Sequence, residues 1–517
     1  MKLATTVLLL SCLVAGAAAL GQAQPGAKAP PAKAVPSKTA PLQVPAVKPA
    51  AKSAPAVPPA AVPAATVPPP AVPPTAVPPT ALPSGAVPPG TVPPGDAPSA
   101  EKTVEDAALP PPSSAAQKLY SAAKSDLLQI RMLLKNGRSQ SSVGSGFMVG
   151  TTNLVLTNYH VVSQMAIDPD VYIGEYVDTD GKSGPVELLA VDVLHDLAVV
   201  RIKNRLGTGF FEVPEQPVKL TQGQYLYSLG NPLDLGFAIS EGSYNGIISR
   251  SFYDQLMFTG PINSGMSGGP SVTVSGKVAG VNVSKRRDGE LVSFLVPVRY
   301  AQELLKKVST QIAPPKDFNP LIGEQLLAHQ RAMIDRLLDS PLDLKSMGPY
   351  VVPVRESEQV RCWGRSNVKA EAVFTADTIA CAMESAIFVS ESHQTGHVSM
   401  THQYVRSASL DPVRFAALAS TLFKADNLGT NKDTRLTGPM CTEKFVKTKT
   451  LPLRAVTCVR AYRKFAGLYN FTLLTASTDQ DRASLQSRLD VSGVSFENGV
   501  RSTRAFLDAL GRRGSAK

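Results

Sequence analysis

The sequence predicts a mainly β protein, and three observations support this prediction. Between residues 142 and 297, short apolar runs alternate with Gly, Asn and Asp, which is typical of many short strands joined by turns. The stretch before them is dominated by Pro and Ala, and the region after them holds four of the five cysteines. We therefore expect a pair of β-barrels between a disordered Pro-rich segment and a C-terminal α+β region with disulfides.

The first residues are typical of an export signal. Met1-Lys2 supplies a positive charge, an apolar run covers Leu3 to Leu20, and small residues up to Ala23 suit a signal peptidase. We expect residues 1–23 to be a signal peptide of a bacterial protein that is periplasmic or secreted. A retained membrane anchor and a lipoprotein processed at Cys12 are alternatives. The shortness of the apolar run and the early position of the cysteine argue against them.

Residues 24–114 consist almost wholly of Pro, Ala, Val, Thr, Lys and Ser, with repeated Val-Pro-Pro. Such a composition cannot bury a core, and Pro favours the polyproline II conformation. At about 3.1 Å per residue the segment would extend roughly 280 Å. It is expected to be disordered, either as a passive tail or as a semi-rigid spacer.

The apolar runs that predict strands cover residues 146–149, 154–157, 188–193, 198–202, 225–229, 246–248, 255–259, 278–283 and 291–297. Apolar residues at helical spacing before them predict a helix over 115–135, or a helix followed by a strand. A helix over 300–312 is expected to close this region. We therefore expect one folded domain over 115–313.

Pro314 and Pro315 mark the next boundary. Apolar residues at helical spacing predict an amphipathic helix over 321–338, so residues 314–345 are expected to form a helical linker. The mixed pattern of residues 346–517 predicts an α+β domain, and no motif in it indicates a chemistry.

Cys362, Cys381, Cys441 and Cys458 are even in number, which in an exported chain indicates disulfides. Three connectivities are open, and we predict the local one, Cys362–Cys381 and Cys441–Cys458. Each bridge would close a short loop, which is worth about 3 kcal/mol by chain entropy. The absence of a C-x-x-C spacing argues against a zinc site.

Three segments carry candidate catalytic residues. His160 lies in 157–162, Asp196 in 195–200, and Ser267 in the Gly-rich run 265–270. A serine hydroxyl is a poor nucleophile at neutral pH, so it needs a base beside it and donors for the oxyanion that it creates. Glycines beside Ser267 allow a tight turn that points two N–H groups at one spot.

The order His, Asp, Ser is that of the chymotrypsin-type triad. Residues of about 140–310 resemble a trypsin-like serine peptidase of the HtrA (Deg) type. The matching phrases are, in order, 144–147, 156–162, 196–200, 229–232, 246–249, 263–270 and 280–282. The resemblance implies two packed six-stranded β-barrels with the active site in the crevice between them.

The roles follow from the chemistry of peptide hydrolysis. Ser267 is expected to be the nucleophile, His160 the general base and then acid, and Asp196 the residue that holds the imidazole in the right tautomer. The N–H groups of Gly265 and Ser267 are expected to form the oxyanion hole. His195 competes with His160 for the role of base, but the family phrase around each residue favours His160.

Specificity is inferred from the resemblance. Pro261, six residues before the nucleophile, lies where trypsin-like digestive enzymes carry Asp, so a basic P1 residue is not expected, and small or medium apolar P1 residues are. The strand Gly280-Val281-Asn282 is expected to pair with the substrate backbone.

Three departures from the family pattern are visible. Met266 stands where the family often has Asn, and Phe258–Pro261 replaces a polar phrase, so a regulated switching of the serine loop is not carried over. No PDZ-like carboxylate-binding loop follows Ile312.

The net charge of +11 is scattered along the chain, and no aromatic–basic platform is visible, so nucleic acid is excluded as a partner. Protein or peptide substrates are expected, with association with the bacterial envelope as a further expectation and the oligomeric state left open. No cofactor and no metal are expected. His393, His397 and His402 would need to lie on one face to bind a metal, and packed or exposed histidines are the favoured interpretation.

Two hypotheses of function remain at this point. The first is an exported serine endopeptidase that acts through an acyl-enzyme intermediate. The alternative is an envelope-associated binding or scaffold protein whose peptidase domain is vestigial, with the C-terminal domain on a Pro-rich tether as its active part.

Overall fold

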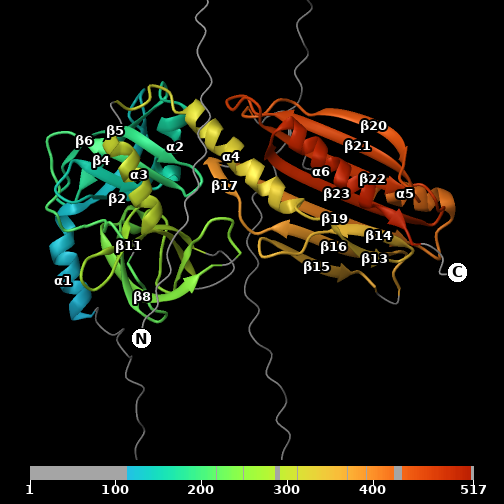
Figure 1. The fold of residues 1–517 in the computed structure, drawn as a ribbon, viewed down its shortest axis with the longest axis horizontal. Helices are drawn as coiled ribbons and strands as arrows, with labels where there is room; N and C mark the ends of the chain where they lie inside the picture. The colour runs from blue at the N-terminus through green and yellow to red at the C-terminus, as the bar shows by residue number, and fades with distance from the viewer. Residues whose placement is uncertain are drawn as a thin grey trace, which may run out of the picture. The chain divides into compact units, whose positions relative to one another are not determined.

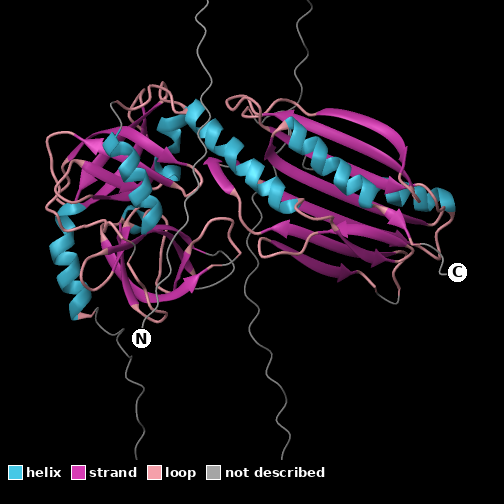
Figure 2. Cartoon of the chain, viewed as in Figure 1, coloured by secondary structure: helices cyan, strands magenta, loops and turns pink. Residues whose placement is uncertain are grey.

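The computed structural model describes residues 113–216, 218–248, 250–285, 291–310, 313–368, 371–391, 393–423 and 434–513. All of them lie within one compact unit, Lys102–Lys517. The predicted signal peptide, Cys12 and the Pro-rich segment as far as residue 112 lie outside the described residues. The prediction of a mainly β protein is confirmed, as Figure 2 shows by the dominance of strands.

The first half of the predicted peptidase region is a closed barrel with the strand order β1-β2-β3-β6-β5-β4. Its strands are β1 (Leu127–Leu134), β2 (Gln140–Met148), β3 (Leu154–Thr157), β4 (Tyr172–Asp178), β5 (Ser183–Asp192) and β6 (Leu197–Ile202). Helix α1 (Ser114–Ala123) precedes it, so the apolar spacing over 115–135 is a helix followed by a strand. Helix α2 (Tyr159–Ile167) and strand β4 were not predicted.

The second half is another closed barrel, with the strand order β10-β11-β12-β9-β8-β7. Its strands are β7 (Tyr225–Gly230), β8 (Ala238–Ile247), β9 (Leu256–Phe258), β10 (Pro270–Val272), β11 (Val278–Lys285) and β12 (Ser293–Pro297). Helix α3 (Val298–Thr310) follows, as expected for 300–312. Two six-stranded barrels agree with the chymotrypsin-like fold that the sequence predicts.

The C-terminal region contains an antiparallel sheet with the order β15-β16-β19-β23-β22-β21-β20. Its strands are β15 (Val360–Ser366), β16 (Thr375–Met383), β19 (His397–Arg406), β20 (Met440–Lys447), β21 (Pro452–Ala461), β22 (Tyr469–Ser477) and β23 (Ala483–Val494). Smaller sheets are formed by β13 (Asp343–Met347), β14 (Tyr350–Val354) and β24 (Gly511–Arg512), and by β17 (Ile387–Ser390) with β18 (His393–Thr395).

Helices cover one face of this seven-stranded sheet. They are α4 (Asn319–Leu337) and α6 (Phe496–Ala509), and α6 runs along the sheet in Figure 1. Helix α5 (Pro412–Leu422) packs through Phe415 at one end of the sheet. The core between the sheet and the helices is apolar and includes Met333, Leu489 and Phe506. Each helix of the described part is too short or too polar to span a bilayer.

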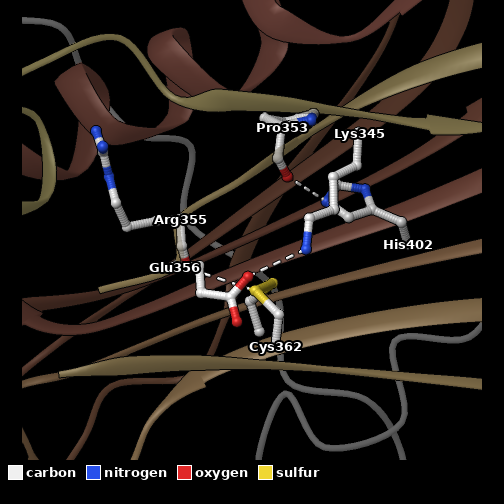
Figure 3. The surroundings of a disulfide bond; sticks show 7 residues. Lys345, Pro353, Arg355, Glu356, Cys362 and His402 are labelled. Atoms are coloured by element: carbon white, nitrogen blue, oxygen red, sulfur yellow. Dashed lines mark hydrogen bonds and ion pairs between the residues drawn. A yellow bond between two sulfur atoms is a disulfide. The ribbon is translucent and has the colours of Figure 1, made fainter. Parts of the chain in front are cut away.

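The two disulfides are those that the sequence predicts, Cys362–Cys381 and Cys441–Cys458. Each joins residues that face each other on neighbouring strands, β15 to β16 and β20 to β21. Since β15 and β20 are the two edges of the sheet, each edge strand is covalently tied to its neighbour. Figure 3 shows the first bridge beside the Lys345–Glu356 ion pair.

Candidate active site

His160 is the second residue of helix α2, which begins at the edge of the first barrel. The residue before the helix, Asn158, is fully buried and donates from its side chain to the carbonyl oxygen of Asp196, 2.8 Å away. This hydrogen bond ties the start of the helix to the turn that carries the candidate aspartate.

Asp196 lies in the turn before β6 with a φ of 55°, in the left-handed region that Asp tolerates better than most residues. Its carboxylate accepts two hydrogen bonds from His160, one from the backbone N–H at 2.8 Å and one at ring Nδ1, 2.6 Å away. With Nδ1 held by the carboxylate, Nε2 is left to act as the base. Burial lowers the pKa of His160, but the charge and the hydrogen bond of Asp196 outweigh it, so the pKa is raised above 6.5.

The serine loop 263–270 approaches neighbouring backbone so closely that its glycines cannot be replaced. Gly265 has a φ of 91°, and a Cβ there would lie 2.3 Å from the carbonyl oxygen of Asn231. Gly268 has a φ of 87°, and a Cβ there would lie 2.2 Å from the carbonyl oxygen of Ser145. Only glycine combines this backbone conformation with these contacts.

The peptide between Ser264 and Gly265 is held in one orientation. The carbonyl oxygen of Ser264 accepts a hydrogen bond from the N–H of Leu233 at 2.7 Å. In a trans peptide the N–H points opposite to the C=O, so the N–H of Gly265 faces away from Leu233. Among the described residues, no group accepts a hydrogen bond from the N–H of Gly265 or of Ser267. Neither N–H group is therefore engaged within the described residues, which is a requirement for a donor to an oxyanion.

The hydroxyl of Ser267 donates to the carbonyl oxygen of Val283, 3.2 Å away, and within the described residues no hydrogen bond joins it to His160. Val283 lines the same cleft as His160 and Asp196. Hydrogen bonds of a catalytic group are often looser without substrate, so this geometry does not conflict with a Ser–His pair.

Met266 and the altered phrase Phe258–Pro261 pack against each other. Met266 is 2% exposed and lies in an apolar cluster with Phe258 and Ile262. These two departures from the family pattern are therefore linked. Met266 stands where the family often has Asn, Phe258 begins the segment that replaces a polar phrase, and the two side chains pack in the same apolar cluster. The serine loop is anchored here by apolar packing.

The four residues predicted to bind substrate lie in two places: Pro261 is in a loop, and the other three are in strand β11. Pro261 is exposed, and its carbonyl oxygen accepts a hydrogen bond from Ser240 Oγ. Gly280, Val281 and Asn282 lie in β11, with β12 on one side and β10 or the serine loop on the other. They therefore offer no free edge to a substrate strand.

Asn282 has a different part in the site. Its buried side chain accepts from Ser228 and Ser271, both at 2.8 Å, and donates to the carbonyl oxygens of Leu229 and Met266. All four hydrogen bonds of the amide are thus satisfied, and one of them fixes the residue before Ser267.

Helix α2 is also held from the C-terminal half of the chain. At its start, Tyr159 Oη donates to the carbonyl oxygen of Val389 at 2.8 Å. At its end, the carbonyl oxygen of Ile167 accepts from Asn319 Nδ2 at 3.1 Å and from Lys464 Nζ at 3.0 Å. The last carbonyls of a helix lack partners within it, so these donors complete the helix.

Helix α4, expected as a linker, also contacts the first barrel. Gln325 accepts from the N–H of Val193 at 2.8 Å and donates to the carbonyl oxygen of Val191 at 3.0 Å. These residues directly precede the turn of Asp196. The sequence gives no signal for this contact, nor for Asn319, Lys464 or Val389, because each lies far from its partner along the chain.

The other histidines have structural partners. His195 bonds Asp192 at 2.7 Å and stacks on Tyr300. His402 is buried between Ser487 and Pro353, as Figure 3 shows for Pro353, and burial lowers its pKa to about 4. His393 and His397 lie on β18 and β19. No group of three or more potential metal ligands occurs among the described residues.

The model of the trypsin-like peptidase domain family matches residues 144–281. The probable periplasmic serine endoprotease DegP-like of Bartonella henselae is 28% identical over 172 residues, covering 32% of this chain and 33% of that protein. The putative serine protease HhoB of Synechocystis is 28% identical over 210 residues, covering 39% and 48%. The mitochondrial serine protease HTRA2 of Drosophila virilis is 30% identical over 181 residues, covering 33% and 41%.

These matches span a third to a half of the relatives' length. The residues matched by the family model lie in the two barrels and include His160, Asp196 and Ser267. The chain therefore contains a region, residues 144–281, that matches the trypsin-like peptidase domain family, and it is similar in part to serine proteases of the HtrA type.

Proposed function

We propose that this protein is an exported serine endopeptidase that hydrolyses peptide bonds in proteins through His160, Asp196 and Ser267. The observation that carries the proposal is the double hydrogen bond from His160 to the Asp196 carboxylate. It fixes both the position and the tautomer of the imidazole, which is what a general base for serine requires. The N–H groups of Gly265 and Ser267, which have no acceptor within the described residues, would supply the second requirement, donors for the oxyanion.

In the proposed mechanism the Ser267 hydroxyl turns from Val283 to His160 Nε2 when substrate binds. His160 takes the proton as Ser267 Oγ attacks the scissile carbonyl carbon, and the carbonyl oxygen becomes an oxyanion between the two N–H groups. His160 then protonates the leaving amine, which leaves an acyl-enzyme. A water molecule, deprotonated by His160, releases the acid product and restores Ser267.

The substrate is proposed to bind as an extended strand. Within the described residues, Asn282 is the last residue of β11 that has backbone partners on both sides, so we take the substrate edge to begin at Val283. The carbonyl oxygen of Val283 lies beside Ser267, which places this edge next to the reacting bond. With Pro261 at the predicted base of the P1 pocket, small or medium apolar P1 residues are part of the proposal.

Location and chain organisation belong to the same proposal. The signal peptide at 1–23 would direct export, and the segment 24–114 would tether the peptidase domain (115–313), the helical segment (314–345) and the C-terminal domain (346–517). The periplasmic description of the Bartonella relative supports export. Association with the envelope would follow from such a tether.

Labelling of the purified full chain with a fluorophosphonate tests this function. We expect a covalent adduct on Ser267 that disappears in Ser267→Ala and persists in Ser275→Ala, an exposed serine of the same barrel. A folded wild-type chain that is not labelled would contradict the proposal. It would favour the alternative hypothesis of a binding protein with inactive barrels.

A further inference from the structure

The cleft that contains His160 is not formed by the barrels alone. It has a volume of about 750 Å³, and its walls include Asp196 of the first barrel and Val283 of the second. The remaining wall comes from the hairpin β17–β18, through Phe388 and His393. A segment more than 220 residues beyond His160 in the sequence thus borders the cleft of the candidate base.

This hairpin is fixed to the barrel. Val389 is 1% exposed, and with Ile387 it belongs to the apolar core of the first barrel. The backbone of Val389 accepts the hydrogen bond of Tyr159, the residue directly before His160. On the other strand, Thr395 hydrogen-bonds the hydroxyl of Tyr462 at 2.5 Å. The hairpin is therefore anchored on both strands.

Phe388 is the hairpin residue that reaches the base. It is partly buried and packs against the same apolar core as its neighbours Ile387 and Val389. Its ring meets His160 edge-on, with the ring centroids 5.7 Å apart and the planes at 66°. It also packs against Tyr159 at 6.3 Å. The side chain is half-buried and leaves one part open to the cleft.

We propose that the hairpin β17–β18 is a wall of the substrate cleft and that Phe388 determines which substrate side chain fits beside His160. A peptide paired with the edge that begins at Val283 would send alternate side chains to opposite faces, and one of them would face Phe388. Since Phe388 and Val283 both present apolar surface, this position would take an apolar side chain such as Leu or Val. The proposal rests on the proposed peptidase function and adds a specificity site from the C-terminal half of the chain.

The full chain with Phe388→Ala tests this assignment. Peptide substrates would vary one position at a time on the N-terminal side of the scissile bond, and kcat/KM would be measured for Leu, Val, Ala and Glu at each position. At one position we expect the preference for Leu over Ala to fall at least tenfold. The rate of fluorophosphonate labelling of Ser267 would be measured on the same variant, to show that its nucleophile still reacts.

Phe445→Ala is the matched control, since Phe445 is 75% exposed on the distant edge strand β20. Phe388→Leu keeps an apolar side chain and should retain most of the preference, which provides a test if the alanine variant does not fold. Tyr159→Phe removes only the hydrogen bond to Val389 and should weaken the preference in the same direction.

Unchanged substrate preferences in the folded Phe388 variants would overturn the proposal. A uniform rise in kcat/KM for all substrates would also overturn it, because Phe388 would then be a barrier and not a selective wall. Failure of the proposed function is distinguishable, since wild type and Phe445→Ala would then both fail to react with the fluorophosphonate. The specificity site would be rejected with it.

Discussion

The loop that carries Ser267 and the helix that carries His160 differ in where their supports come from. The serine loop is held by hydrogen bonds from the two barrels: Ser145 Oγ donates to the carbonyl oxygen of Gly265 at 2.6 Å, and Leu233 and Asn282 make the bonds described above. Helix α2 is held by the barrel at Asp196 but also by Val389, Asn319 and Lys464 from the C-terminal half. The proposed nucleophile is thus supported from within the barrels, and the proposed base depends partly on a region that the matched family model does not include.

This difference separates two properties of the site. Oxyanion binding should respond to changes within the barrels alone. The orientation of the imidazole and the shape of the cleft should respond to changes on both sides. The predictions below test this separation, beginning with the largest expected effect.

Asp196→Asn should have the largest effect, on the order of a 10⁴-fold loss in kcat, because it removes the charge and reverses the tautomer preference of His160. Asp192→Asn, four residues before Asp196, is a matched control, since Asp192 makes the same pair of hydrogen bonds to His195. The control should stay within a few-fold of wild type. Similar losses in both variants would show that a general change in the turn, and not the triad, causes the effect.

The pH dependence follows from the raised pKa of His160. Asp196 stabilises the imidazolium, so the ring stays protonated up to a pH above 6.5. The base must be neutral, so kcat/KM should fall tenfold per pH unit below a midpoint that lies above 6.5. An acid limb with a midpoint clearly below 6.5 would contradict the ion pair described here.

Gly265→Ala tests the serine loop. The left-handed φ and the approach to Asn231 cannot both survive a Cβ, so the peptide should rotate and misplace one oxyanion donor. Loss of one donor typically costs about 10²–10³-fold in kcat. Gly137→Ala has a similar φ of 82° with nothing within 4 Å of its Cβ, so it separates backbone strain from the clash. Equal activity of the two variants would mean that the loop is not held as described.

Met266→Asn tests whether the apolar packing of Met266 contributes to the stability of the folded chain. The residue would bring a buried amide among Phe258 and Ile262, at a cost of about 1–3 kcal/mol in the free energy of unfolding. Met440→Asn, at a position 79% exposed on β20, should change stability by less than about 0.5 kcal/mol. Thermal or denaturant unfolding of both variants measures the difference, and an equally stable Met266→Asn would contradict the apolar anchor.

The short strands of the barrels could be predicted because their signals are local, whereas their closure into two six-stranded barrels was expected from the family resemblance. Glycines at 265 and 268 indicate a tight turn, and short apolar runs between turn residues indicate strands, so both features can be recognised from neighbouring residues alone. Both disulfides could be predicted because each joins neighbouring strands of a hairpin. Helix α2 was missed because it is short and buried on most sides, so it lacks the amphipathic period that indicates a helix.

The supports of the base could not be predicted for another reason. Tyr159 lies within the recognised phrase around His160, yet its partner Val389 is 230 residues away. The acceptor is a backbone carbonyl group, which every residue has, so the residue type at position 389 does not indicate the contact. The substrate edge that we propose begins at Val283 and not within the predicted 280–282, because the point at which β10 ends is set by strand register and not by composition.

The smallest expected effect concerns the far end of helix α2. Asn319 and Lys464 both donate to the carbonyl of Ile167, so either one alone can satisfy it. Asn319→Ala and Lys464→Ala should each lower kcat by less than about twofold, because exposed ion pairs such as Lys464–Asp168 contribute little. The double variant leaves the carbonyl without either donor and should lower kcat by about three- to tenfold, more than the product of the single effects.

Lys306→Ala, on the exposed side of α3, is the control. Since the change acts through the orientation of His160, the acid limb of kcat/KM should shift in the double variant, while KM stays nearly constant. If the double variant keeps the wild-type kcat and acid limb, Asn319 and Lys464 do not help to position His160. The hydrogen bond from Tyr159 to Val389 would then be the one described support of helix α2 from the C-terminal half that could affect the base.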